Sequence, residues 1–174
     1  MLDRIRSDWN AHNHDWSRHG FWALVVYRFG RWRYGIRRRW MRAPLSFLYK
    51  LLKFFADAAF GIEIPCETVI GRRFTIEHTG AIVISGDAVF GDDCVIRQGV
   101  TVGLRNRHRR GSPRIGDRVD IGAGAKLLGE ITIGDDVAIG ANAVVLCDVP
   151  DGCIAVGVPA EVKVRRGLRE VEMV

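Results

Sequence analysis

Two short segments of the sequence hold the residue types best suited to chemistry. The first, EHTG at 77–80, contains His78, and a histidine imidazole can accept a proton from a hydroxyl near neutral pH. The second, LRNRHRRGS at 104–112, is rich in arginine, which pairs with carboxylates and phosphates. We therefore look first at these two segments for a base and for a group that binds an anion.

Both segments interrupt a six-residue repeat. The repeated apolar positions are Ile64, Ile70, Ile76, Ile84, Phe90, Ile96, Val102, Ile115, Ile121, Leu127, Ile133, Ile139 and Val145. Six is an even number, so these side chains share one face of extended backbone, whereas six residues make a poor helical period. The interval lengthens between Ile76 and Ile84 and between Val102 and Ile115. Insertions in a solenoid form loops, often on a binding face.

The repeat predicts a mainly β fold, a hexapeptide solenoid of short parallel strands that stack coil on coil. Glycine accounts for 20 of the 174 residues, and glycine suits the corners between such strands. A glycine-rich sandwich is the alternative, but its strands rarely keep one register over so many repeats. We expect the solenoid at 61–160 with a protruding loop at 103–114, followed by a tail at 161–174.

Residues 1–60 form a unit of different chemistry. They carry twelve Lys and Arg against four Asp and Glu, whereas 61–174 carry fourteen against sixteen, and all five Trp lie in 1–60. Apolar side chains on one side of 20–34 predict a helix, and Pro44 predicts a break before a second helix at 45–59. Charged residues interrupt the longest apolar run, so we predict no transmembrane segment.

For several other residues we predict no functional role. His12 and His14 form an HxH pair, but two ligands without a third at a firm spacing are a weak metal signal, so we predict an exposed helix start and no metal site. The four cysteines form no CxxC pair, which predicts free buried thiols in a reducing cytoplasm. We expect no nucleic acid partner, because no stacking aromatics accompany the basic loop.

The motifs resemble a known family. The runs IGRRFTIEHTGAIVI, GVTVG and PRIGDRVDIGAGAKLLGEITIGDDVAIGANAVVL, then DVP and GVPA, are similar in order and spacing to the hexapeptide-repeat acetyltransferases, and within them to the serine O-acetyltransferase branch. The resemblance covers about residues 20–165. It implies a left-handed parallel β-helix, a homotrimer, and acetyl-CoA as co-substrate in the groove between neighbouring subunits.

The resemblance also implies roles for single residues. His78 matches the catalytic histidine that takes the proton from an acceptor hydroxyl, and Glu63 matches the acid that orients it. Glu77 matches the aspartate of the family's Asp-His motif, and Gly103 lies where backbone N–H groups meet the thioester oxyanion. The positions implied to hold coenzyme A are Ala123, Gly124, Lys126, Gly140, Lys163, Arg165 and Arg166.

The sequence departs from serine acetyltransferases where these bind their acceptor. In place of their DRHP-type segment, which ends at the proline matching Pro113, the chain has RRGSP, so Arg109 and Arg110 are the remaining acceptor-binding candidates. The segments APLSFLYKLLKFF, GIEI and GRRFTIEH instead resemble exopolysaccharide O-acetyltransferases of the colanic-acid type. That resemblance implies a sugar hydroxyl on a polysaccharide precursor, often one carried on a lipid.

Three functional hypotheses follow. The first is an O-acetyltransferase acting on a sugar in exopolysaccharide biosynthesis, the second a serine O-acetyltransferase, and the third a non-catalytic trimeric scaffold. The tryptophans and arginines of 20–55 suit either packing against the coil or a neighbouring subunit, or peripheral contact with a membrane. We expect a cytoplasmic protein that lies at the inner face of the membrane in the latter case.

Overall fold

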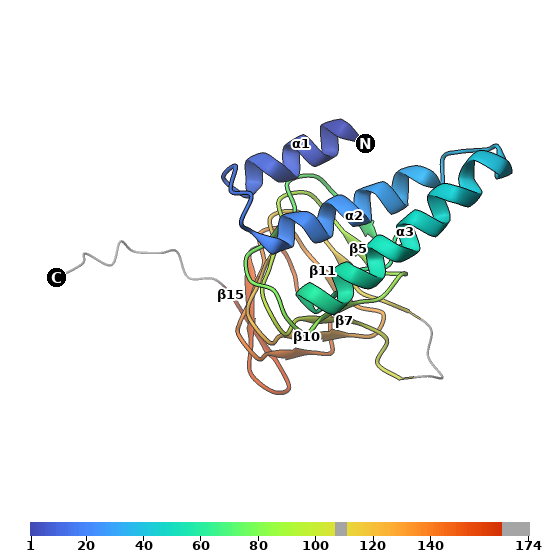
Figure 1. Cartoon of the computed structure of the whole chain (residues 1–174). Coiled ribbons are helices and arrows are strands. Elements are labelled where there is room, and N and C mark those ends of the chain that lie inside the picture. The colour runs from blue at the N-terminus through green and yellow to red at the C-terminus, as the bar shows by residue number, and fades with distance from the viewer. Residues whose placement is uncertain (107–110, 165–174) are drawn as a thin grey trace.

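The computed structural model describes residues 1–106 and 111–164 (Figure 1). Three helices come first: α1 (Leu2–Ala11), α2 (His19–Arg33) and α3 (Arg39–Phe60). The strands that follow are β1 (Ile62–Glu63), β2 (Val69–Ile70), β3 (Thr75–Ile76), β4 (Ile82–Ile84), β5 (Val89–Phe90), β6 (Val95–Ile96), β7 (Thr101–Gly103), β8 (Arg114–Ile115), β9 (Asp120–Ile121), β10 (Lys126–Leu128), β11 (Thr132–Ile133), β12 (Ala138–Ile139), β13 (Val144–Val145), β14 (Cys153–Val156) and β15 (Glu161–Val164).

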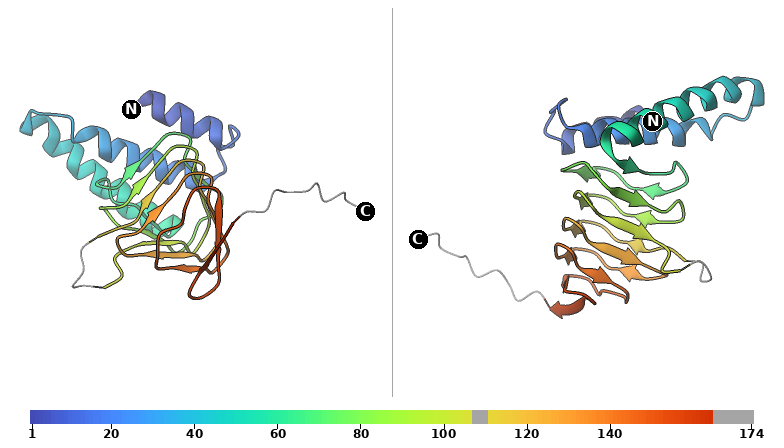
Figure 2. Two further views of the ribbon diagram at one scale, coloured as in Figure 1. Left: turned by 180° about the vertical axis from the view of Figure 1, so that it is seen from behind. Right: turned by 60° about the horizontal axis from the view of Figure 1, so that its bottom comes forward.

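The strands form three sheets, one on each side of a solenoid. Their orders are β1-β4-β7-β10-β13, β11-β8-β5-β2 and β15-β14-β12-β9-β6-β3, so each of the first four coils contributes one strand to each sheet. Pairing between coils is parallel, and Ile62 opposite Ile82 marks one full coil. The last strand, β15, is antiparallel to β14. The views in Figure 2 show the coils stacked below the helices, and the fold is the left-handed parallel β-helix that the repeat and the resemblance predicted.

The repeated apolar residues fill the interior of the solenoid. Ile76, Ile96, Ile121 and Leu127 are completely buried. Burying each such side chain is worth about 2 kcal/mol, and the stack of coils provides that gain at every repeat. The six-residue period therefore reports the core directly, because each strand from β2 to β13 holds one buried residue of the repeat.

One corner of the solenoid explains why Asp follows Gly in the repeat. Four aspartate side chains each accept a hydrogen bond from a backbone N–H of the preceding coil. The pairs are Asp92 with Arg72, Asp117 with Asp92, Asp135 with Asp117, and Asp151 with Asp135, at 2.7–2.9 Å. A glycine before each N–H is required by space: a Cβ on Gly91 would lie 2.1 Å from Asp117 Oδ1.

The helices cover the open N-terminal end of the solenoid. Arg28 on α2 is buried, where its guanidinium donates to both carboxylate oxygens of Asp8 on α1 and to the carbonyl of Ile70. His12, after α1, is also buried, and its Nε2 accepts the N–H of Ile76 on β3. These contacts bind otherwise unpaired backbone groups at the edge of the first coil, as buried polar groups require.

The structure corrects two expectations for the helical part. Pro44 does not end a helix, because it lies in the second turn of α3, where a missing N–H removes a single hydrogen bond. His12 is buried at the end of α1 instead of exposed. Trp16, Trp22, Trp32 and Trp40 are exposed within this chain, so the coil is not their packing partner, and packing against a neighbouring subunit stays a prediction. None of the helices in the described ranges is long and apolar enough to cross a membrane.

Candidate active site

His78 lies at a corner between β3 and β4, where the eight-residue interval interrupts the repeat. Its side chain is exposed, while Ile76 before it and Ile82 after it are completely buried. The corner turns through Gly80, with φ of 110°, and Ala81, with φ of 53°. The two extra residues therefore form a wider turn that presents the imidazole outside the core.

Glu63 approaches the same corner from the previous pass of the chain. Gly61 ends α3 with φ of 62°, and a Cβ there would lie 3.1 Å from Gly80 Cα. The Gly61 carbonyl accepts the N–H of Ile82 at 3.0 Å. Glu63 is two residues beyond this contact, and its side chain points outward between the buried Ile62 and Ile64. Among the residues described, no hydrogen bond joins the Glu63 carboxylate to the His78 ring.

Glu77 has a different partner. Its carboxylate forms an ion pair with the guanidinium of Arg97 on the next coil, with 2.7 Å between Oε2 and Nε, and Arg97 also binds Asp120. This row of alternating charges lies across the outer side of three successive coils. Glu77 is thus occupied in holding the coil that carries His78, an arrangement that the motif alone did not predict.

The corner with His78 continues along the solenoid. Gly80 accepts the N–H of Gly99 and Gln98 that of Gly124, each at 2.8 Å. Ala123 in turn accepts the N–H of Asn142 at 2.8 Å. Coils are about 4.8 Å apart, so Gly124 lies about 10 Å along this edge from the His78 corner. One edge therefore brings together His78 and two of the positions implied to hold coenzyme A.

A row of outward residues on the adjoining sheet adds two more predicted positions. Glu63 is opposite Val83, Val83 opposite Thr101, and Thr101 opposite Lys126. Three steps between strands separate Glu63 from Lys126, about 14 Å. Lys126 Nζ donates to the carbonyl of Gly99, which holds the ammonium at the corner.

Gly103 lies at the end of β7, two strands from Glu63 on β1 in the same sheet. A Cβ on Gly103 would be 3.6 Å from Ser85 Cβ, so the position has room for a side chain. Its carbonyl accepts the N–H of Gly129. Nearby, the buried Ser112 forms a hydrogen bond with Ser85, with 2.9 Å between the two Oγ atoms. Sequence reasoning missed this serine pair, because 27 residues separate its members.

The remaining cofactor candidates lie toward the C-terminal end. Gly140 follows β12, and a Cβ there would be 2.7 Å from Val156 Cγ1. Lys163 on β15 is exposed and pairs loosely with Glu161 at 3.9 Å. Arg109, Arg110, Arg165 and Arg166 lie outside the residues that the structure describes.

The described ranges contain no group of three His, Cys, Asp or Glu arranged to hold a metal ion. The four cysteines are free, and Cys147 is exposed, unlike the other three. Burial raises the pKa of the Cys94 thiol to about 11, which keeps it protonated and unreactive at neutral pH.

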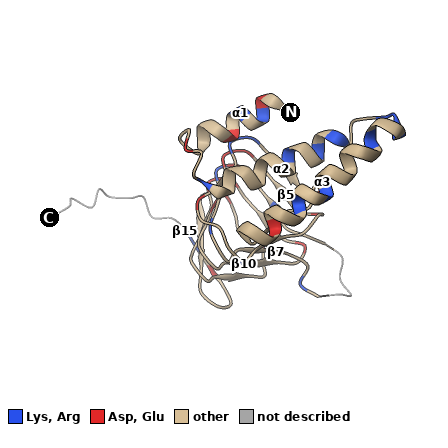
Figure 3. Cartoon of the chain, in the orientation of Figure 1, with Lys and Arg blue, Asp and Glu red and all other residues tan. Residues whose placement is uncertain are grey.

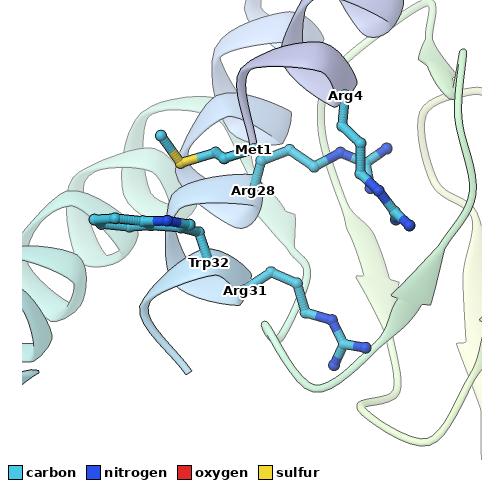
Figure 4. A pocket seen from close by; sticks show the side chains of 5 residues that line it. All are labelled: Met1, Arg4, Arg28, Arg31 and Trp32. Carbon is cyan, nitrogen blue, oxygen red and sulfur yellow. The ribbon is translucent and has the colours of Figure 1, made fainter. Parts of the chain in front are cut away.

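A basic pocket lies on the helical part, apart from the His78 corner. Met1, Arg4, Arg28, Arg31 and Trp32 line it (Figure 4). Arg4 and Arg28 both donate to the carbonyl of Ile70, and Arg31 donates to the carbonyl of Glu67. These guanidiniums therefore bind the exposed backbone of the first coil, a structural use of the arginines.

Comparison with known proteins gives the family. Residues 112–147 match the model of the bacterial transferase hexapeptide, six repeats. The chain is 40% identical over 169 residues to the WcaB acetyltransferase of Escherichia coli (strain K12), which is named for colanic acid biosynthesis; the match covers 94% of this chain and 99% of that protein. It is 41% identical to the serine acetyltransferase of Synechococcus elongatus, over 86% of this chain and 59% of that protein.

Solved structures agree with this assignment. The crystal structure of serine acetyltransferase from Brucella abortus has a TM-score of 0.80 and 29% identity, over 95% of this chain and 70% of that chain. The same enzyme in complex with coenzyme A also gives 0.80. The resemblance and the fold predicted from the sequence are both confirmed. The chain belongs to the hexapeptide-repeat acetyltransferases, and it is an acyltransferase.

Proposed function

We propose that this enzyme transfers the acetyl group of acetyl-CoA to a sugar hydroxyl in exopolysaccharide biosynthesis, with His78 as general base. The observation that supports it best is the edge shared by His78, Ala123 and Gly124. A base exposed about 10 Å from a row of small residues suits a reaction between a hydroxyl and a long thioester. The near-complete match with WcaB, a protein named for colanic acid biosynthesis, favours the sugar acceptor.

The chemistry assigns one task to each residue. The imidazole of His78 accepts the proton of the hydroxyl while its oxygen attacks the thioester carbonyl, and returns that proton to the departing thiolate. Glu63 stabilises the imidazolium formed between these events. Backbone N–H groups beside Gly103 donate to the oxyanion.

The donor set at the edge is suited to coenzyme A. Ala123, Gly124 and Gly140 are small, so backbone can approach a bound ligand closely. Lys126, Lys163 and Arg165 supply cations for its phosphates. We expect a homotrimer in which the neighbouring subunit completes the groove.

L-serine is the second candidate acceptor, because the solved structures of similar fold are serine acetyltransferases. The local structure favours the sugar: Ser112 is buried and bonded to Ser85, and Gly111 has φ of 137°. No cation stands at either position to bind the carboxylate of an amino acid.

A thiol-release assay with acetyl-CoA separates the candidates. Purified enzyme is offered L-serine and a panel of sugars and sugar nucleotides, and free coenzyme A is measured with time. We expect turnover with at least one sugar and none above hydrolysis with serine. Turnover of serine alone would reject the sugar acceptor. If coenzyme A is released only without dependence on any acceptor, and His78→Ala releases it at the same rate, the enzymatic role of this corner is rejected.

A further inference from the structure

The outward face of α3 is strongly apolar. Its exposed large apolar side chains are Trp40, Met41, Phe47, Leu48, Leu51, Leu52, Phe54 and Phe55. Trp40, Phe47 and Phe54 are 72%, 74% and 67% exposed and recur every seven residues, so they lie on one line along the helix, about 21 Å long. We call these eight residues the apolar face. Continuous apolar surface of this kind marks a site of interaction.

The apolar face is not the side of α3 that packs within the chain. Tyr49 and Ala56 lie on the opposite side and are buried. The apolar surface continues from α3 into a groove between α2 and α3, which Trp22, Val25, Leu52 and Phe55 help to line. Figure 2 shows the two helices extending beyond the edge of the solenoid, so the coils leave this surface uncovered.

Positive charge surrounds the apolar face. Between residues 37 and 60 the sequence has six Lys and Arg and a single acid, Asp57. Lys53 already binds that carboxylate, with 2.6 Å between Nζ and Oδ2. Arg37, Arg38 and Arg39, the basic tip, are exposed at the turn between α2 and α3, and the described residues provide no carboxylate partner for them (Figure 3).

We propose that the apolar face and the basic tip bind the surface of a membrane that contains anionic lipid. Aromatic side chains with flanking arginines suit the interface, where rings lie at headgroup level and guanidiniums bind lipid phosphates. A second copy of this face is a poorer occupant, because it offers the basic tip no free acid: Asp57, the carboxylate of α3, is already bound by Lys53. The inference goes beyond acetyl transfer and does not depend on the acceptor.

The proposal is tested by flotation of the full-length enzyme with vesicles. One set is phosphatidylcholine alone and the other a mixture of phosphatidylcholine and phosphatidylglycerol, each at low and high salt. The variants are Phe47→Ser with Phe54→Ser, and Arg38→Gln with Arg39→Gln. The matched control is Val69→Ser with Arg72→Gln, which changes one exposed apolar residue and one exposed arginine on the solenoid.

We expect the unmodified enzyme to float with the anionic vesicles and to be released by salt. Loss of the two arginines should weaken partition about thirtyfold, at about 1 kcal/mol for each charge. The variant with Phe47→Ser and Phe54→Ser should lose vesicle binding, and the control variant should bind like the unmodified enzyme. Equal binding to both vesicle types, or variants that bind like the unmodified enzyme, would overturn the proposal. The proposal would also be overturned if the unmodified enzyme bound no vesicles but formed a larger oligomer that the Phe47→Ser, Phe54→Ser variant dissociates. Thiol release in vesicle-free solution should be unchanged in all variants.

Discussion

At the scale of single residues, Glu63 has the role that a substitution tests most cleanly. Its side chain is exposed on β1, so Glu63→Gln removes the charge without disturbing the core. We expect kcat to fall about tenfold to a hundredfold while KM for acetyl-CoA is unchanged, because the role proposed for Glu63 is to stabilise the imidazolium of His78.

Two comparisons make this result specific. Glu63→Asp should recover part of the rate, since the charge is restored at a slightly different distance. Asp87→Asn, which neutralises another exposed carboxylate of the solenoid, should behave like the unmodified enzyme. A normal kcat in Glu63→Gln would contradict the assigned role.

The residues of the site could be predicted from the sequence only in part. His78 stood out because the repeat lengthens around it, a signal carried within a few neighbouring residues. Arg97 and Ser112 did not stand out, because their partners Glu77 and Ser85 lie on other coils. Contacts between coils depend on the register of the solenoid, which a short motif does not encode.

At the scale of elements, a buried ion pair joins α1 to α2, between Asp8 on α1 and Arg28 on α2. Asp8→Ala leaves the Arg28 guanidinium buried without its carboxylate, and an unpaired buried charge costs about 3 kcal/mol or more. We expect the midpoint of thermal unfolding to fall by roughly 6 °C or more, measured by circular dichroism. Asp3→Ala, on the exposed side of α1, is the control and should unfold normally. Equal midpoints for the two variants would show that the pair does not stabilise the fold.

The same cap should make stability depend on pH. Burial lowers the pKa of His12, an effect that the nearby Arg18 reinforces and Asp8 opposes. A histidine whose pKa is lower folded than unfolded stabilises the protein above its ordinary pKa of about 6.5, and this contribution is lost as the pH falls below that value.

The measurement compares thermal midpoints at about pH 7.5 and about pH 5.5, on either side of the ordinary histidine pKa. The unmodified enzyme should lose more stability on acidification than His12→Gln does, whereas the exposed His14→Gln should match the unmodified enzyme. An equal loss of thermal stability on acidification in all three proteins would show that His12 does not cause the pH dependence.

The elements themselves were only partly predictable. The solenoid followed from its period, because each inward side chain repeats the same environment. The helices were predicted less accurately: Pro44 predicted that the third helix begins after it, but α3 begins earlier, at Arg39, and contains Pro44. α1 escaped notice because it is short and is fixed by the contacts of Asp8 and His12 with distant residues.

At the scale of the whole molecule, charge and chemistry are separated. The basic helical part caps one end of the solenoid (Figure 1), and the corner with His78 lies in the first coil, where Gly61 at the end of α3 lies against Gly80. The net charge of +6 is thus the sum of a basic cap and a slightly acidic solenoid.

The central claim, that the corner with His78 carries out acetyl transfer, is tested most directly by His78→Ala. Acetyl transfer to the acceptor found in the thiol-release assay is measured beside the affinity for coenzyme A and the thermal midpoint. Because the side chain is exposed, we expect normal folding and coenzyme A binding, with kcat reduced about a hundredfold to ten-thousandfold. His14→Ala, the same change at another exposed histidine, should leave kcat normal. Undiminished transfer by a folded His78→Ala enzyme would contradict the claim.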